Sequence, residues 1–385
     1  MFHKMRWCVV RFQAPGVGRV KAGPWLSMLA GLLGIAALAL EGCAAPTGGG
    51  AGSTSGRKAA AADAEKVLVP HPTWTCGMPG GIPKPEGGVL VFEADMDLDQ
   101  ILKVGHTPYG ERQVLVVRGG TITGGKLAGT VLPGGLDFEL TLANGTVEVE
   151  QLLVFRTSEG RLVYLRNAGV GTHPQDVRVV LDAEAPAAST AAWLNSGTYV
   201  ARRVVDAAAK TLKLQVYDVA GVSTKADPAR TVAVVKPANV PAQPWDYRKA
   251  EPAERPGDPI VTESVSLGAS LPVGASKHGN RNIIPITGGV LTGSITGKVL
   301  AGGADYQNLT HAPTLDARYL WQTTDGDILI VRNTGPFGSL VPTFEVATGS
   351  KYAWLNSGNY LSSSPSMAAG GVGITMYKSR PMGKG

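Results

Sequence analysis

The chain has 385 residues, of which 44% are hydrophobic and only 17% are charged, and it contains 51 glycines and 26 prolines. This length allows two or more domains, and this composition favours an all-β protein with many turns over a helical one. The first 42 residues contain five basic residues and one acidic residue, so they account for +4 of the formal net charge of +6 and leave +2 for the rest. Because no block of like charge remains, nothing in the sequence indicates a nucleic-acid-binding protein.

Residues 1–42 are expected to form a signal peptide. A basic segment precedes an uncharged run of 16 residues, 25–40, which is short for a membrane-spanning helix of about 20 residues. The Leu-Glu-Gly-Cys sequence at 40–43 resembles a bacterial lipobox, although Glu41 replaces the small or apolar residue usual there. Lipidation of Cys43 would anchor the protein to a membrane, whereas ordinary cleavage nearby would release it. We therefore expect an exported protein of the cell envelope, lipid-anchored at the outer membrane or periplasmic.

Residues 43–86 are expected to be a flexible tether, because Gly, Ser and Ala dominate the first part of this segment. The chain has three cysteines, Cys8, Cys43 and Cys76. If Cys43 is lipidated, Cys76 has no partner within the mature chain, so the sequence contains no disulfide framework.

One phrase occurs twice, as AAWLNSGTY at 191–199 and as YAWLNSGNY at 352–360. Solenoid repeats recur every ~20–50 residues, so this much longer spacing indicates a duplicated domain. We place the first copy at 87–220 and the second at 261–380. The proline-rich segment 221–260 between them is expected to be a semi-stiff linker, since proline interrupts sheet pairing.

Short apolar runs alternate with turn signals in the first copy. The dipeptide Asn144-Gly145 predicts a hairpin, because both residues tolerate positive φ. Eight or so short strands without a helical period favour a barrel or a sandwich, and closure into a barrel would remove exposed sheet edges. The clearest predicted strands span 89–98, 113–117, 147–156, 161–167, 190–200 and 211–219.

The same landmarks return in the second copy. Gly288-Gly289 matches Gly119-Gly120, and the stretch 299–306 matches 131–138. Several of these motifs together resemble a family of domains of unknown function, the one numbered 3237. They are Pro285-Ile286-Thr287-Gly288-Gly289, Gly302-Gly303-Ala304-Asp305, Leu315-Asp316-Ala317-Arg318-Tyr319, Asp325-Gly326 and Tyr352-Ala353-Trp354-Leu355-Asn356, with Thr107-Pro108-Tyr109-Gly110-Glu111-Arg112 and Leu132-Pro133-Gly134-Gly135 in the first copy.

The resemblance covers about two thirds of the chain and implies one small, closed antiparallel β-barrel per copy. It implies no settled activity, and the tandem arrangement and the leader depart from the usual single-domain members. We therefore predict an all-β protein of two tandem antiparallel, calycin-like β-barrels, packed as an intramolecular pseudo-dimer within a monomeric chain.

Asp316 and Arg318 are the leading candidates for a ligand site. Because strand side chains alternate between faces, the two share one face. If this face points into the barrel, the charges must pair and form a polar floor suited to a ligand; if it points outward, they form a solvated salt bridge. The first copy has Glu150 and Leu152 at these positions, so it keeps the acid and loses the base, and the second copy is the better candidate.

Four further residues are candidate ligand contacts, each with a structural alternative. Asp305 follows a glycine pair and would otherwise cap its own turn. Arg281, which matches Arg112, would either bind a ligand carboxylate or support a strand. Trp354 and Asn356, assumed to lie on a strand, would share a face as an aromatic wall beside an amide, or else serve as a core tryptophan and a turn-bonding asparagine.

The six histidines are scattered, so no metal site is expected, and no nucleotide-binding or nucleophile motif indicates a cofactor. The leading hypothesis is small-molecule binding in the barrel mouths. The alternatives are an isomerase- or cyclase-type enzyme that uses Asp316 and Arg318, and a structural envelope protein with filled barrels. The residues leave open whether any catalysis occurs.

Overall fold

A computed structural model of the chain describes residues 66–224, 227–238, 248–368 and 371–381. The expected signal peptide and Cys43 lie outside these residues. Within the described ranges, no helix is both long and apolar enough to cross a membrane.

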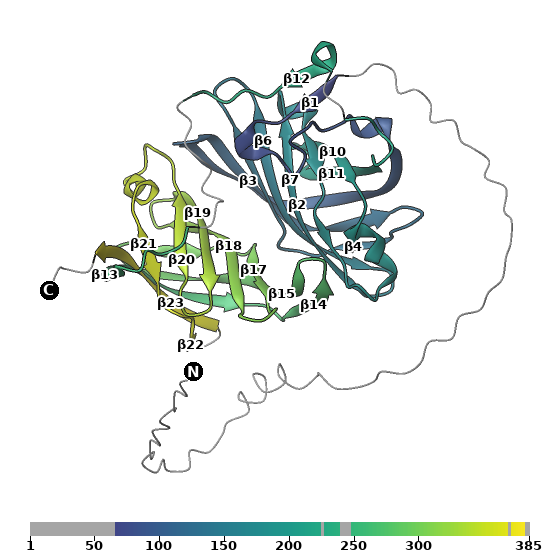
Figure 1. Cartoon of the computed structure of the whole chain (residues 1–385). Helices are drawn as coiled ribbons and strands as arrows, with labels where there is room; N and C mark the ends of the chain where they lie inside the picture. Colours follow the sequence, from purple (N-terminus) through teal and green to yellow (C-terminus); the bar gives the residue numbers. More distant parts are fainter. Residues whose placement is uncertain (1–65, 225–226, 239–247, 369–370, 382–385) are drawn as a thin grey trace, which may run out of the picture. The chain divides into compact units, whose positions relative to one another are not determined.

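The first repeat is a closed barrel, as predicted (Figure 1). Eight of its strands form a ring in the order β3-β2-β11-β10-β8-β7-β6-β5, which closes because β5 pairs with β3. All of the ring's pairings are antiparallel. The strands of this repeat are β2 (Val89–Thr107), β3 (Gly110–Thr123), β4 (Gly129–Val131), β5 (Leu136–Thr141), β6 (Val147–Thr157), β7 (Leu162–Gly171), β8 (Arg178–Val180), β9 (Ala183–Glu184), β10 (Tyr199–Asp206) and β11 (Thr211–Asp218).

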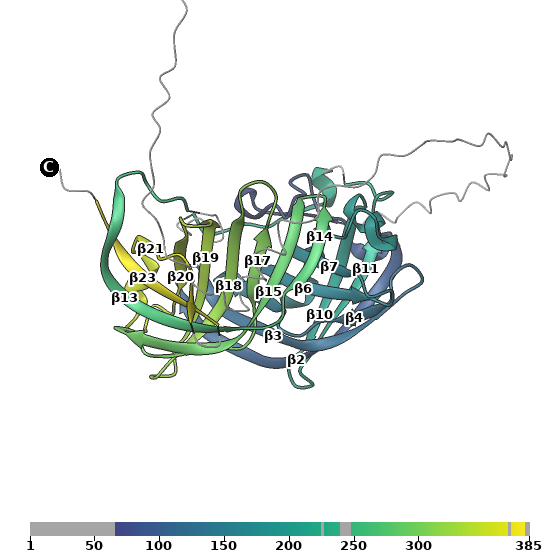
Figure 2. The ribbon, with the colours of Figure 1, turned by 90° about the horizontal axis from the view of Figure 1, so that it is seen from below.

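The second repeat follows the same path in a sheet of 11 strands, in which β15, β17 and β18 run side by side (Figure 2). The ends of its path, β20 and β21, are not paired as strands within the described residues. A backbone hydrogen bond of 3.1 Å from Ser362 N to Leu340 O joins the adjoining segments. The strands are β13 (Glu254–Leu267), β14 (Leu271–Ser276), β15 (Gly279–Gly293), β16 (Gly297–Val299), β17 (Ala304–Asn308), β18 (Thr314–Thr323), β19 (Ile328–Pro336), β20 (Val341–Glu345), β21 (Tyr360–Ser362), β22 (Ser366–Ala368) and β23 (Gly371–Pro381).

Each barrel encloses its own apolar core, because alternate side chains of every strand point inward. Close packing between strands explains why the glycine pair occurs in both repeats. A Cβ added to Gly120 would collide with the carbonyl oxygen of Asp95, and one added to Gly289 would collide with that of Ser264. Glycine therefore lets β3 and β15 cross their neighbouring strands closely.

The repeated AWLN phrase is not a strand, contrary to the sequence-based expectation. It forms 3-10 helices η4 (Thr190–Asn195) and η6 (Ala353–Asn356). The side chain of Asn195 bonds both N and O of Ala185, and Asn356 does the same with Val346, each bond being 2.8 or 2.9 Å. These amides tie each helical turn to the strand before it, so the phrase is a conserved corner of both repeats.

The segment assigned to the tether is partly ordered. It contains β1 (Val67–Val69), η1 (Pro72–Trp74) and η2 (Pro85–Gly87). Strand β1 pairs in parallel with β12 (Thr231–Ala233), which follows η5 (Pro228–Arg230) in the predicted linker. Together these segments pack on the first barrel, because Leu68, Ile82 and Val234 are buried against its outer residues Val170 and Val200.

The two barrels pack against each other through their outer faces. A third apolar cluster contains residues from both repeats, among them Phe138 and Leu152 of the first and Tyr306 and Leu320 of the second. Near its centre, Gly303 N donates a 2.7 Å hydrogen bond to Gly134 O. Each of these two glycine stretches matches the other, so the contact is that of a pseudo-twofold interface.

Reciprocal ion pairs flank this interface. Arg112 Nε lies 2.8 Å from Glu345 Oε1, and Arg281 Nε lies 2.8 Å from Glu184 Oε2. The two arginines occupy matched positions, since Arg112 pairs with Leu140 across β3 and β5 as Arg281 pairs with Asn308 across β15 and β17. Each repeat thus supplies one arginine and one glutamate to the other.

Candidate binding cleft between the repeats

Asp316 and Arg318 share a face of β18, as predicted, and this face points out of the barrel toward the first repeat. Arg318 Nε donates a 2.6 Å bond to Asp316 Oδ1, and Arg318 Nη1 lies 3.3 Å from both carboxylate oxygens of Glu150. Neither sequence-based alternative is therefore correct. The pair does not form a barrel floor, and it is not a solvated salt bridge, because the second barrel packs this face against the first.

Glu150 on β6 is the buried centre of this network. Arg166 Nη2 approaches it to 3.0 Å and Arg332 Nη2 to 3.6 Å, in addition to Arg318. Burial alone would raise the pKa of Glu150, but the three guanidinium groups outweigh burial and lower the pKa to about 2. Burial, reinforced by repulsion from Arg318, lowers the pKa of Arg332 to about 9. The carboxylate of Glu150 thus stays ionised and holds three cations together.

A cavity of about 730 Å³ opens beside this network. Four cationic side chains line it, while Asp316 is the acidic residue of the lining. Its remaining walls combine polar residues and Tyr306 with the aliphatic residues Ala250, Leu315 and Pro336. The lining consists of Arg166, Lys249, Ala250, Arg281, Tyr306, Asn308, Thr314, Leu315, Asp316, Arg318, Thr334, Gly335, Pro336 and Ser339. We call this cavity the open cleft.

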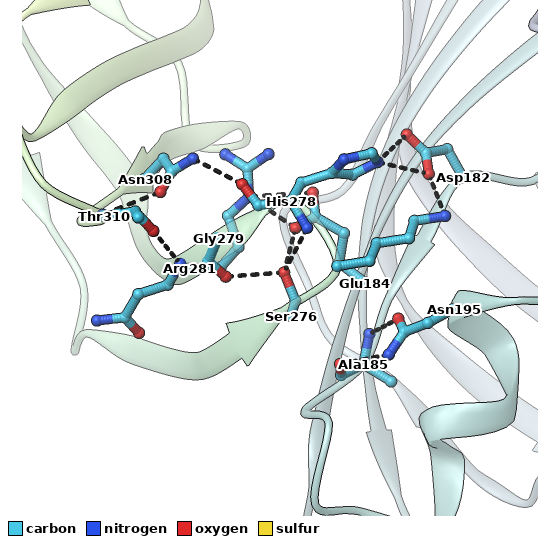
Figure 3. Close-up of polar contacts among 12 residues, drawn as sticks. Asp182, Glu184, Ala185, Asn195, Ser276, His278, Gly279, Arg281, Asn308 and Thr310 are labelled. Atoms are coloured by element: carbon cyan, nitrogen blue, oxygen red, sulfur yellow. Dashed lines mark hydrogen bonds and ion pairs between the residues drawn. The ribbon is translucent and has the colours of Figure 1, made fainter.

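Arg281 lines the open cleft, and Figure 3 shows its contacts where the two repeats meet. Its guanidinium Nε bonds both carboxylate oxygens of Glu184, at 3.0 and 2.8 Å. Ser276 Oγ also donates to Glu184, so two residues of the second repeat, Ser276 and Arg281, bond this carboxylate of the first repeat. His278 Nε2 lies 3.1 Å from Asp182, which adds a more exposed polar contact at the rim (Figure 3). Arg281 supports the interface and lines the cleft at once.

Asp305 lies inside the second barrel, on the opposite face of the sheet from the cleft. Its side chain accepts a 2.8 Å bond from Gln307 Nε2 and a 3.2 Å bond from the backbone N of Asp316. Burial raises the pKa of Asp305 to about 6. The residue braces the strand that carries Asp316, and it does not join the candidate site.

Trp354 and Asn356 are likewise remote from the cleft lining. The amide of Asn356 is engaged with the backbone of Val346. The indole of Trp354 packs against the second barrel's core and lies 5.0 Å from Lys378 Nζ. The structural alternative therefore holds for Trp354, which packs against the core, whereas Asn356 bonds the backbone of Val346 and not the turn that follows it.

The structure therefore brings together Arg281, Asp316 and Arg318 but leaves Asp305, Trp354 and Asn356 elsewhere. Sequence reasoning missed Arg166 and Lys249, which complete the cationic lining. The sequence offered one indication of Arg166 as a site residue, because Arg166 lies in the Leu165-Arg166-Asn167 triplet that matches 331–333 in the second copy. The sequence offered no such indication for Lys249, because this residue belongs to the linker and has no counterpart in the repeats.

A second cavity of about 540 Å³ lies on the first repeat, between the 73–78 segment and strands β7 and β8. Arg166 lines both cavities. Within the described residues, no group of three or more His, Cys, Asp or Glu side chains is arranged to hold a metal ion.

Comparison with known proteins places these features in a family. The sequence model of a family described as "Protein of unknown function (DUF3237)" matches residues 88–219 and 257–339. The UPF0311 protein blr7842 of Bradyrhizobium diazoefficiens is 41% identical over 78 residues, which are 20% of this chain and 51% of the relative. A UPF0311 protein of Rhodopseudomonas palustris is 31% identical over 87 residues, 23% of this chain and 57% of the relative. The chain thus spans about half the length of the curated relatives it matches.

Similar solved structures cover about one repeat. A β-barrel-like protein of Acinetobacter baumannii has 19% sequence identity and a TM-score of 0.31, and covers 34% of this chain and 94% of its own. A protein of unknown function from Rhodopseudomonas palustris has 23% identity and a TM-score of 0.31, and covers 36% and 99%.

Proposed function

The chain belongs to the DUF3237 family of proteins of unknown function, and for this tandem member we propose that it binds a small organic anion in the open cleft between its two barrels. The observation that carries the proposal is the lining of the cleft, in which Arg166, Arg281, Arg318 and Lys249 surround one acidic side chain, Asp316.

The dimensions and chemistry of the cleft suit such a ligand. Its volume of about 730 Å³ falls within the range of roughly 300–1,000 Å³ of small-molecule sites. Guanidinium groups present paired N–H donors that match the geometry of a carboxylate or phosphate. Among the ion-paired arginines that line the cleft, Arg166 has the most exposed side chain, at 43%, so it is the first candidate to contact an entering anion.

Asp316 supports binding better than acid–base catalysis. Arg318 donates to both of its carboxylate oxygens, at 2.6 and 3.2 Å. A carboxylate whose two oxygens both accept hydrogen bonds from one guanidinium group has fewer lone pairs free to exchange a proton with a substrate. The proposal therefore favours a binding protein over the isomerase or cyclase alternative.

We further propose that the chain is exported and that a lipid on Cys43 holds it at a membrane. The support is the basic and apolar leader at 1–42 and the lipobox-like sequence at 40–43. Cys43→Ala should move the protein from the membrane fraction to the soluble fraction of its bacterial host. An unchanged membrane fraction would exclude the lipid anchor.

Calorimetric titration of the full chain tests the binding proposal. Benzoate should bind and its neutral isostere benzamide should not. Lys249→Ala removes an exposed cation from the cleft and should weaken benzoate binding by about threefold to tenfold. The matched control Lys298→Ala removes an equally exposed lysine of β16, outside the cleft lining, and should leave affinity unchanged. Equal binding of benzoate and benzamide, or no binding of any carboxylate, would refute the proposal.

A further inference from the structure

The open cleft has a pseudo-symmetric counterpart on the other side of the interface, at positions that the strand registers identify. Phe138 pairs with Glu150 and Leu140 with Glu148 in the first repeat. Asn308 pairs with Thr314 in the second, and Leu315 with Gly335 as Val149 pairs with Gly169. Three residues that line the cleft thus have direct counterparts: Asn308 corresponds to Leu140, Thr314 to Glu148 and Gly335 to Gly169.

The chain itself fills this counterpart, which we call the sealed site. Trp74 Nε1 donates a 2.8 Å hydrogen bond to Gly169 O, and the indole packs on Leu140 and Leu142. Lys236 Nζ lies 2.7 Å from Glu148 Oε1, and both side chains are almost fully buried. Among the described residues, an aromatic ring with an N–H donor and a charged group therefore occupy this place in the first repeat, whereas the second repeat has the open cleft there.

The open cleft lacks these two covering residues but keeps partners for a ring. Tyr306 lines it and stacks on Tyr164 with ring centroids 5.1 Å apart. Phe337 is 60% exposed between two cleft-lining residues, Pro336 and Ser339. A large exposed apolar side chain at the rim of a cavity is a typical ligand contact.

The two sites differ at one charged position. In the sealed site the acid Glu148 receives the ammonium of Lys236. In the open cleft Thr314 replaces that acid and the lining is cationic. The group that accompanies the ring in the open cleft must accordingly be an anion.

We propose that the ligand of the open cleft is a planar aromatic acid with a ring N–H or O–H, of the indole or phenol carboxylate class. Its ring takes the place that Trp74 takes in the sealed site, its donor faces the backbone at Gly335, and Phe337 covers it from the rim. The inference rests on the proposed anion binding and adds the chemical class of the ligand.

Calorimetry with two carboxylates of equal charge tests this. Indole-3-carboxylate should bind the full chain about tenfold more tightly than cyclohexanecarboxylate. Phe337→Ala, a change at an exposed side chain, should remove much of this preference, because indole-3-carboxylate loses an aromatic contact that cyclohexanecarboxylate does not make. Equal affinities for the two acids would overturn the aromatic inference alone, whereas no binding of either acid would overturn the binding proposal itself.

A second variant tests where the ring of the ligand lies. Ser339→Trp places an indole at the cleft, as Trp74 lies in the sealed site, and should abolish indole-3-carboxylate binding with an unchanged melting temperature. Lys298→Trp, on exposed β16, is the matched control and should bind normally. Normal binding by Ser339→Trp would also overturn the inference.

Discussion

The sealed site and the open cleft show what a duplicated interface becomes when its two halves diverge. The ion pair of the sealed half, Arg112 with Glu345, has both side chains fully buried. In the open half, the side chain of Arg281 retains 19% exposure and that of Glu184 only 3%. The two halves share matched strands and a matched pair of arginine and glutamate. They differ in the residues that pack over these strands. Among the described residues outside the repeats, Trp74 and Lys236 cover one half, whereas Lys249 and Ala250 line the open cleft of the other half.

Arg112→Ala and Arg281→Ala are the variants expected to differ most. Loss of Arg112 leaves Glu345 buried without its guanidinium, which should cost about 3–5 kcal/mol of unfolding free energy. Loss of Arg281 should cost about 1–2 kcal/mol, because water reaches that half of the interface. Urea denaturation of both variants at pH 7 measures the difference. Equal losses would show that burial does not distinguish the two halves.

The two cores should differ in their response to pH. Glu263 is fully buried in the second barrel, where Tyr319 Oη and Trp321 Nε1 donate to it at 2.6 and 3.0 Å. Burial raises its pKa from 4.5 to about 7. The folded state therefore favours the protonated acid, so its stabilising effect is complete below pH 4.5 and is lost as pH rises through 7. This loss should be on the order of 3 kcal/mol.

Glu263→Gln removes this titrating group and should reduce the decline of thermal stability between pH 4.5 and 8, leaving the smaller decline caused by Asp305, whose pKa burial also raises. Glu93→Gln, at an acid on the outer part of β2, serves as the control and should keep the decline of the wild type. A wild-type melting temperature that rises across this pH range would contradict the assignment.

Trp74→Ala should convert the sealed site into a second open one. The indole is only partly buried, so the loss of its packing and of its hydrogen bond to Gly169 should cost about 2 kcal/mol. Free indole should then raise the melting temperature of the variant in a concentration-dependent way, because it binds only the folded state. The wild-type chain, whose site is occupied, is the control. No rescue by indole would show that the indole's place in the sealed site cannot be refilled by a free ring.

Lys277→Ala should have the smallest effect. Its ammonium pairs with Asp182 at the rim of the open half, where 45% of the aspartate side chain is exposed. Such a pair contributes about 0–1 kcal/mol and is screened by salt. Urea denaturation at low and at high ionic strength should show a small loss that disappears in salt. If Lys277→Ala lost as much free energy of unfolding as Arg112→Ala, the pair of Lys277 and Asp182 would be as important to the interface as the buried ion pair, which would contradict this prediction.

The strands and the repeat were predictable because their signals are local. Short apolar runs between turn residues marked the strands, and the repeated glycine pairs mark the same crossings in both repeats. The AWLN phrase was recognised as a repeat but misread as a strand. Its helical turn depends on bonds from Asn195 and Asn356 to backbone ten residues earlier, which no local pattern reveals.

The candidate site was predictable only in part. Alternation correctly placed Asp316 and Arg318 on one face, yet it could not say what that face meets. The answer came from Glu150, which lies 168 positions from Arg318 and belongs to the other barrel. Arg166 and Lys249 join the cleft for the same reason, since packing of distant segments brings them there.

The order of residues alone determined that this protein is two copies of one rolled antiparallel sheet, because side-chain alternation and turn chemistry act over a few neighbouring residues. Only the tertiary structure decided that the charged outer face of each copy meets the other copy, and that Trp74 and Lys236 cover one half of that meeting surface but not the other. Such covering depends on where remote segments settle in space, and sequence periodicity carries no record of it.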